Sequence, residues 1–172
     1  MFLFPNSLLI SMLICYSHPI FVVYRNYENS FSISDIINDK KTKINIFISF
    51  FVMSCFTIMY EVNKNDYLSL ILILILLFGL FGVCLIKEDK TNILCCHNFF
   101  AVCIFLSIYS FILYYALMKP HVFLYILFVI QNIISVIILK KIKYKEPIIS
   151  CEIFLLINFS ILYLYLHFTE FI

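Results

Sequence analysis

YLSLILILILLFGLFGVCLI, the stretch from Tyr67 to Ile86, contains no charged residue. A helix rises about 1.5 Å per residue, so a helix over this stretch is about 30 Å long, which matches the hydrocarbon thickness of a bilayer. A soluble domain cannot easily bury so long and so uniformly apolar a run. The stretch therefore predicts a transmembrane helix.

The composition of the whole chain also indicates a membrane protein. The 172 residues are 64% hydrophobic and 13% charged, whereas soluble domains average about 45–50% apolar and about 25% charged residues. The formal net charge is only +2, and no basic face outside a bilayer remains to bind nucleic acid. The seven cysteines lie within or beside apolar runs, which favours small buried side chains over a disulfide framework.

Further apolar runs on both sides of this stretch give six predicted spans. We predict an all-α fold, a polytopic integral membrane bundle of about six transmembrane helices that forms a single domain over residues 1–172. The predicted spans are residues 7–24, 44–60, 67–86, 93–118, 121–139 and 148–168. Strands are not expected, because the runs show no apolar–polar alternation and open sheet edges cannot face lipid. The first run lacks a basic leading segment and a small-residue cleavage site, so we expect it to be retained.

Lysine and arginine are distributed unevenly between the two sides of the predicted bundle. The loops after the first, third and fifth spans share one side, and they contain ten basic residues: Arg25, Lys40, Lys41, Lys43, Lys87, Lys90, Lys140, Lys141, Lys143 and Lys145. The loops of the other side contain only Lys64 and Lys119. The positive-inside rule then predicts that the side with the ten basic residues faces the cytoplasm and that both termini lie on the opposite side.

Several polar residues lie near the membrane boundary on that same side. His97 and Asn98 follow about one turn into the fourth span, and Glu152 follows about one turn into the sixth. Ser34 and Asp35 belong to the first loop, which also lies there. Polar side chains in hydrocarbon cost about 2.5–3.5 kcal/mol on insertion scales, so each one calls for a physical reason. We predict that these five residues form a shallow binding site.

This shallow site has two interpretations. In the first, Glu152 orients or charges His97, so that the pair acts as an acid/base couple or binds a lipid headgroup. In the second, the two side chains make hydrogen bonds that fix helix packing, or they reach the interface separately. The sequence contains no nucleophile motif, phosphate-binding loop, metal-ligand cluster or CxxC pair, so we expect neither a metal nor another cofactor.

Other polar residues favour simpler roles. Gln131 and Asn132 lie in the middle of the fifth span and Asn158 in the middle of the sixth, where hydrogen bonding between helices is more common than a polar permeation path. The basic turn between these spans contains Lys140, Lys141, Lys143 and Lys145. It can set the topology alone, or it can attract anionic lipid headgroups by about 1 kcal/mol per charge. Gly79 and Gly82 lie one turn apart in the third span, which predicts close helix packing.

Three segments together resemble the six-span DRAM-like family, which includes damage-regulated autophagy modulators and proteins of GPI-lipid remodelling. FSISDIINDKKTKINIF (Phe31–Phe47) is similar to the family's "ISD" element in the first loop. GLFGVCLIKEDKTNILCCHNFFAVCIF (Gly79–Phe105) resembles its glycine-bearing third span followed by a histidine that opens span four. CEIFLLINFSILYLYL (Cys151–Leu166) resembles the last span, with its glutamate near the start.

The chain departs from the family's pattern at three points. Residues 36–39 stand where the family has glycine and proline, and Ile153 stands where an aromatic residue often follows the glutamate. The family generally has both termini in the cytoplasm, opposite to the orientation that the basic residues predict. The resemblance nevertheless implies that Asp35, His97 and Glu152 share one site, and it implies a role in lipid binding or membrane traffic.

Three functions are compatible with these patterns. The first is a non-catalytic membrane protein, in an endomembrane or the plasma membrane, that binds or organises lipid or regulates membrane traffic. The second is an intramembrane enzyme acting on lipids or lipid anchors, with His97 and Glu152 as the catalytic candidates. The third is a small channel or transporter, which the lack of a carboxylate at mid-depth disfavours. Membrane lipids are the expected partners, and the chain could associate with copies of itself.

Overall fold

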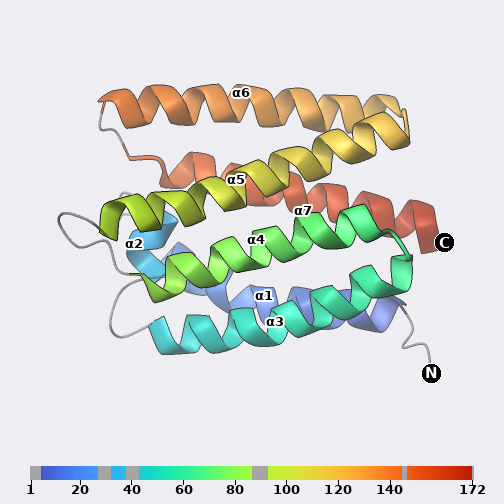
Figure 1. Cartoon of the computed structure of the whole chain (residues 1–172), viewed down its shortest axis with the longest axis horizontal. Coiled ribbons are helices and arrows are strands. Elements are labelled where there is room, and N and C mark those ends of the chain that lie inside the picture. Colours follow the sequence, from blue (N-terminus) through green and yellow to red (C-terminus); the bar gives the residue numbers. More distant parts are fainter. Residues whose placement is uncertain (1–4, 27–31, 38–42, 87–92, 145–146, 172) are drawn as a thin grey trace. The chain divides into compact units, whose positions relative to one another are not determined.

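The computed structural model describes residues 5–26, 32–37, 43–86, 93–144 and 147–171, and every regular element in these ranges is an α-helix. Figure 1 shows the helices along the chain. Their bounds are α1 (Pro5–Asn26), α2 (Ile33–Ile37), α3 (Lys43–Lys64), α4 (Tyr67–Leu85), α5 (Ile93–Met118), α6 (Val122–Tyr144) and α7 (Ile149–Phe171). The predicted all-α class is confirmed.

Six of these helices, all except the short α2, are long and apolar enough to cross a membrane. They contain between 19 and 26 residues, which corresponds to about 28–39 Å. A helix satisfies its backbone hydrogen bonds internally, as the hydrocarbon core requires. The chain is therefore an integral, multi-pass membrane protein.

Helices α3 and α6 extend furthest beyond the C-terminal ends of their predicted spans. Helix α3 continues to Lys64 instead of ending at residue 60, and α6 continues to Tyr144 instead of ending at residue 139. In both helices, charged residues whose sequence suggested a loop between spans belong to the last turn of the helix. Lysine near a helix C-terminus interacts favourably with the helix dipole, which explains why these residues extend the helices.

The contacts divide the chain into two compact units, one comprising Met1–Tyr27 with Ser34–Ser107 and the other Glu28–Ile33 with Ile108–Ile172. In the first unit, α1 packs along α3, and α3 packs against α4. A tight turn joins α3 to α4. Asn65 adopts a positive φ of 55° in it, and the Asp66 carboxylate then caps α4 by accepting from the Ser69 amide at 3.1 Å.

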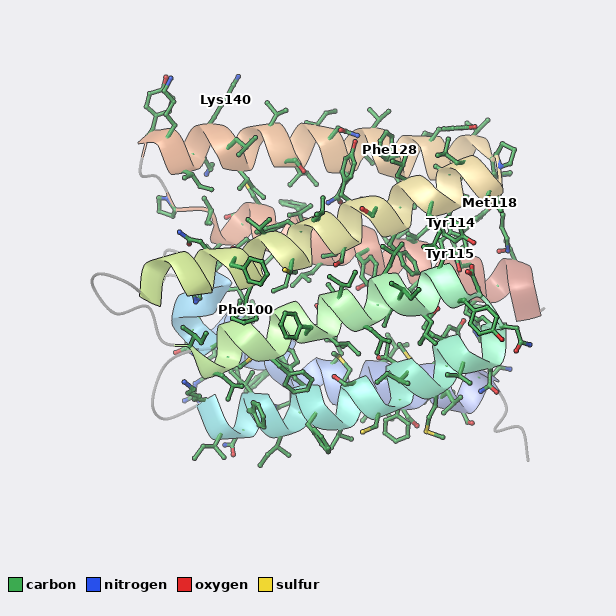
Figure 2. All side chains as sticks on the ribbon, in the orientation of Figure 1. Phe100, Tyr114, Tyr115, Met118, Phe128 and Lys140 are labelled. Atoms are coloured by element: carbon green, nitrogen blue, oxygen red, sulfur yellow. The ribbon has the colours of Figure 1, made fainter. Side chains whose placement is uncertain are left out.

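Two glycines let α4 approach the first half of α5. A β-carbon added at Gly79 would lie 2.9 Å from the carbonyl oxygen of Phe100 and 2.7 Å from Cγ1 of Ile104. One added at Gly82 would lie only 2.0 Å from the ring of Phe100, which is labelled in Figure 2. The close helix packing expected of the two glycines is confirmed.

In the second unit, α6 and α7 pack together through a buried pair of amides. The Asn158 side-chain amide donates to the Oε1 atom of Gln131 and to the Leu127 carbonyl, both at 3.1 Å. Both amide side chains are buried. The predicted bonding between helices is confirmed for Gln131 and Asn158, whereas Asn132 donates to the Phe128 carbonyl of its own helix at 2.7 Å.

Replacing Asn158 with leucine should lower the stability of the protein by about 1 kcal/mol, because it removes a polar contact between two apolar helices. The loss can be measured as a decrease in the free energy of unfolding in mixed detergent–SDS micelles. Asn132→Leu is the matched control, since among the described residues Asn132 bonds to Phe128 of its own helix and to no other. Equal losses in the two variants would contradict the role of Asn158.

Candidate functional site

Glu152 lies in the first turn of α7 and binds the start of α2. Its Oε2 atom accepts a hydrogen bond from the backbone N–H of Ile33, the first residue of α2, at 2.7 Å. The first amides of a helix have no partner within the helix, and a carboxylate is favoured there by the helix dipole. Glu152 therefore links the first turn of α7 to the backbone of Ile33.

The two predicted site residues of the first loop lie in α2. Ser34 and Asp35 directly follow Ile33 in α2. Their side chains lie outside the described residues, so their predicted participation in a site stays a prediction.

His97 lies near the start of α5, is buried, and binds the end of α4. Its Nδ1 atom is 3.3 Å from the carbonyl oxygen of Ile86, the residue that caps the C-terminus of α4. A carbonyl only accepts, so the proton of this hydrogen bond belongs to Nδ1. Asn98, the next residue, is exposed.

A second basic side chain binds the same end of α4. The Nζ atom of Lys43, at the start of α3, donates to the Leu85 carbonyl at 3.4 Å. The last carbonyls of a helix have no partner within the helix, and cations are favoured there. His97 and Lys43 thus connect the starts of α5 and α3 to the end of α4.

The predicted meeting of His97 and Glu152 stays a prediction. His97 belongs to the first unit and Glu152 to the second. Each makes a hydrogen bond to a backbone group of its own unit. The His97 contact joins the start of α5 to the end of α4, and the Glu152 contact joins the first turn of α7 to Ile33, the first residue of α2. Hydrogen bonds of this kind are those of the second interpretation of the shallow site.

The basic residues at the end of α6 differ in exposure. Lys140 and Lys143 are exposed, and Lys140 extends away from α7 in Figure 2. Lys141 is half-buried and donates to the Pro147 carbonyl at 3.2 Å, which links the end of α6 to the segment before α7. Lys145 lies outside the described residues.

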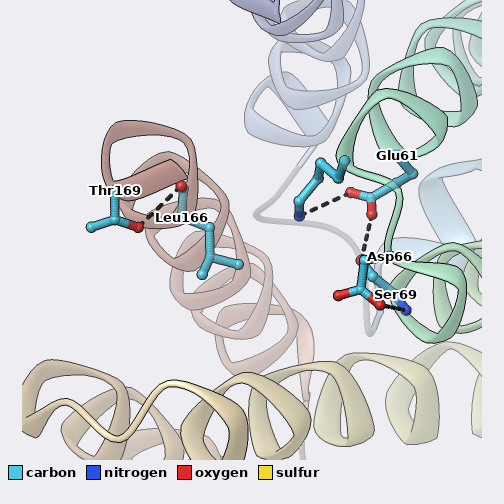
Figure 3. A network of polar contacts seen from close by, with 6 residues as sticks. Glu61, Asp66, Ser69, Leu166 and Thr169 are labelled. Atoms are coloured by element: carbon cyan, nitrogen blue, oxygen red, sulfur yellow. Dashed lines mark hydrogen bonds and ion pairs between the residues drawn. The ribbon is translucent and has the colours of Figure 1, made fainter. Parts of the chain in front are cut away.

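A buried polar cluster at the α3–α4 turn was missed by the sequence interpretation. The side chain of Glu61 is fully buried, and it accepts a hydrogen bond from the Ser69 hydroxyl (Figure 3). The Nζ atom of Lys64 lies 3.6 Å from the other carboxylate oxygen, and its side chain is only 2% exposed. The spacing of Glu61 and Lys64, three residues apart, was the available signal for a pair on one helix face.

No protein-family model, curated protein or solved structure matches this chain. Within the residues that the structure describes, no group of three or more His, Cys, Asp or Glu side chains is placed to hold a metal ion. The function is therefore proposed from the chemistry of the described residues.

Proposed function

We propose that this chain is a non-catalytic, multi-pass membrane protein that binds and organises anionic lipids through the basic end of α6. The exposed lysines Lys140 and Lys143 carry the proposal. Leu139 and Ile142 beside them are exposed and apolar. This combination fits the boundary between acyl chains and headgroups, where a lysine stem contacts lipid and its ammonium group reaches the phosphate.

The contacts of His97 and Glu152 support a positioning role over a catalytic one. A general base needs a nitrogen or oxygen atom within reach of the substrate proton. Here the Nδ1 atom of buried His97 is bonded to a helix-capping carbonyl, and the Glu152 carboxylate is bonded to the first amide of α2. In the proposal these two residues hold helix ends in place.

The resemblance to the DRAM-like family extends the proposal toward membrane traffic. A protein that gathers anionic lipid at one membrane face changes the surface charge that peripheral traffic proteins recognise. The same lipids give the cytoplasmic leaflet its negative potential. Binding there would agree with the orientation that the basic residues predict.

Replacing Lys140 and Lys143 with glutamine should weaken the preference for anionic lipid by about fivefold per lysine, because each contributes about 1 kcal/mol at the membrane surface. The chain contains no tryptophan, so a single Tyr144→Trp substitution at an exposed position beside Lys143 provides a local fluorescent reporter. The measurement compares quenching of this tryptophan by brominated phosphatidylglycerol and by brominated phosphatidylcholine in reconstituted vesicles.

Lys119→Gln in the same reporter background is the matched control, because Lys119 is exposed near the opposite end of α6. It should leave the quenching ratio unchanged. Equal quenching by the two lipids in the Tyr144→Trp protein itself would refute anionic lipid binding at this end of α6.

A further inference from the structure

One exposed face of α1 carries polar residues at regular spacing. Ser11, His18 and Arg25 follow one another at intervals of seven residues. Four residues before each of them stand Ser7, Ile14 and Phe21, also seven apart. Of these six residues, which we call the α1 seam, Ser11 is half-buried and the other five are exposed, with Ile14 at 66% and Phe21 at 60%.

The spacing of the α1 seam is that of a coiled-coil contact. Alternating steps of four and three residues repeat every seven residues and keep one stripe of a helix facing a partner helix. The opposite side of α1 contains its buried residues Leu8, Leu9 and Pro19. The seam therefore has the period of a helix–helix interface, but it lies on the exposed side of the helix.

His18 makes lipid a poor neighbour for the middle of the seam. It lies eight residues before the end of α1 at Asn26, which is about 12 Å into the span. A polar side chain that faces hydrocarbon at that depth is expensive. The polar atoms of this side chain thus favour contact with a molecule that itself offers hydrogen-bonding groups.

The hydrogen bonds of His18 indicate which of its ring nitrogens is available to a molecule that binds at the α1 seam. Its Nδ1 atom is 3.0 Å from the Ser49 hydroxyl oxygen, and this hydroxyl donates to the Asn45 carbonyl, also at 3.0 Å. A hydroxyl has one proton, and Ser49 donates it to the Asn45 carbonyl. The Nδ1 atom of His18 must then donate to the Ser49 oxygen, which leaves Nε2 of the neutral ring as an acceptor. Within the described ranges, Nε2 of His18 has no hydrogen-bond partner.

We propose that the α1 seam pairs with the same seam of a second copy of this chain. Two copies in one membrane share their orientation, so a two-fold axis along the membrane normal brings residues of equal depth together. Serine hydroxyls and imidazoles both donate and accept, so two identical seams supply all the hydrogen-bonding groups that the pair needs. Polar positions in a coiled-coil seam also fix the register of the two helices.

The pairing of two His18 side chains satisfies both rings. One ring keeps its proton on Nδ1 and accepts through Nε2. The other carries its proton on Nε2 and accepts at Nδ1 from Ser49, whose hydroxyl turns away from Asn45. Arg25 lies at the end of the helix, where water and salt screen the repulsion between two copies.

Disulfide trapping in membranes tests the proposed face. Ile14→Cys and Phe21→Cys lie on the α1 seam, and Ile20→Cys is the matched control, because Ile20 is 51% exposed but lies off the seam. Each is placed in a Cys15→Ala/Cys55→Ala background, which removes the half-buried and exposed native thiols of α1 and α3. Copper phenanthroline then oxidises two neighbouring thiols to one disulfide.

We expect disulfide-linked dimers for the two seam variants and none for Ile20→Cys. Dimers of equal yield at all three positions, or at none, would overturn the proposed face. In a second experiment, single-molecule photobleaching in vesicles should show an association constant for His18→Leu about fivefold to tenfold below that of the unchanged chain. Ser11→Leu should give a loss in the same direction. Unchanged association in both variants, or a monomeric parent protein, would also overturn the proposal.

Discussion

Glu61→Ala should lower the free energy of unfolding by about 3–5 kcal/mol, because it breaks an ion pair in which both side chains are buried. The Glu61 carboxylate is fully buried between the Ser69 hydroxyl and the Lys64 ammonium group. Removing it takes the opposite charge away from a lysine side chain that is 2% exposed. The loss is measurable by SDS titration of the purified protein in mixed micelles.

A double variant separates the lost charge partner from lost packing. Glu61→Leu/Lys64→Met replaces both charged groups with apolar ones, and such replacements of a buried pair are often neutral or stabilising. We therefore expect the double variant to be more stable than Glu61→Ala. Glu61→Ala with the stability of the unchanged chain would show that the pair contributes nothing to the α3–α4 turn.

Gly79→Ala should be the other strongly destabilising change, with a loss of about 1–3 kcal/mol from overpacking. The new methyl group would lie 2.9 Å from a backbone carbonyl oxygen and 3.1 Å from the backbone nitrogen of Ile104. Backbone atoms of a helix cannot move aside separately, so α4 and α5 would have to separate. The measurement is again the free energy of unfolding in mixed micelles.

Gly82→Ala provides a matched comparison, because the atoms it meets belong to the side chain of Phe100. Combining it with Phe100→Ala removes that ring and should restore part of the lost stability. The same Phe100→Ala change should not rescue Gly79→Ala, since the carbonyl oxygen of residue 100 remains. Rescue of both glycine variants would contradict a backbone clash at Gly79.

The six spans could be predicted because each is a long apolar run, and α4 is uncharged throughout. The end of α3 could not be predicted in the same way. Glu61 and Lys64 look like solvated turn residues in a single sequence, and only the tight turn that returns Ser69 to Glu61 makes their burial possible. Helix α2 was missed because five residues in a polar loop show no helical period.

The sequence supports a prediction of depth for the candidate site residues, but not of their contacts. Counting residues from the span ends places His97 and Glu152 near one membrane face. It does not give the rotation of each helix about its axis, which decides what each side chain touches. The partners that the structure gives them, the carbonyl of Ile86 and the amide of Ile33, are backbone groups that no side-chain pattern encodes. Gln131 and Asn158 were easier, because mid-span amides have few partners other than each other.

Lipid binding by the exposed lysines of α6 is tested most directly by native mass spectrometry of the protein released from mixed vesicles. We expect retained phosphatidylglycerol on the unchanged chain and on folded His97→Ala, and its loss from Lys140→Gln/Lys143→Gln. Retention by the double lysine variant, together with loss from folded His97→Ala, would move the lipid to the shallow site and contradict binding at the end of α6.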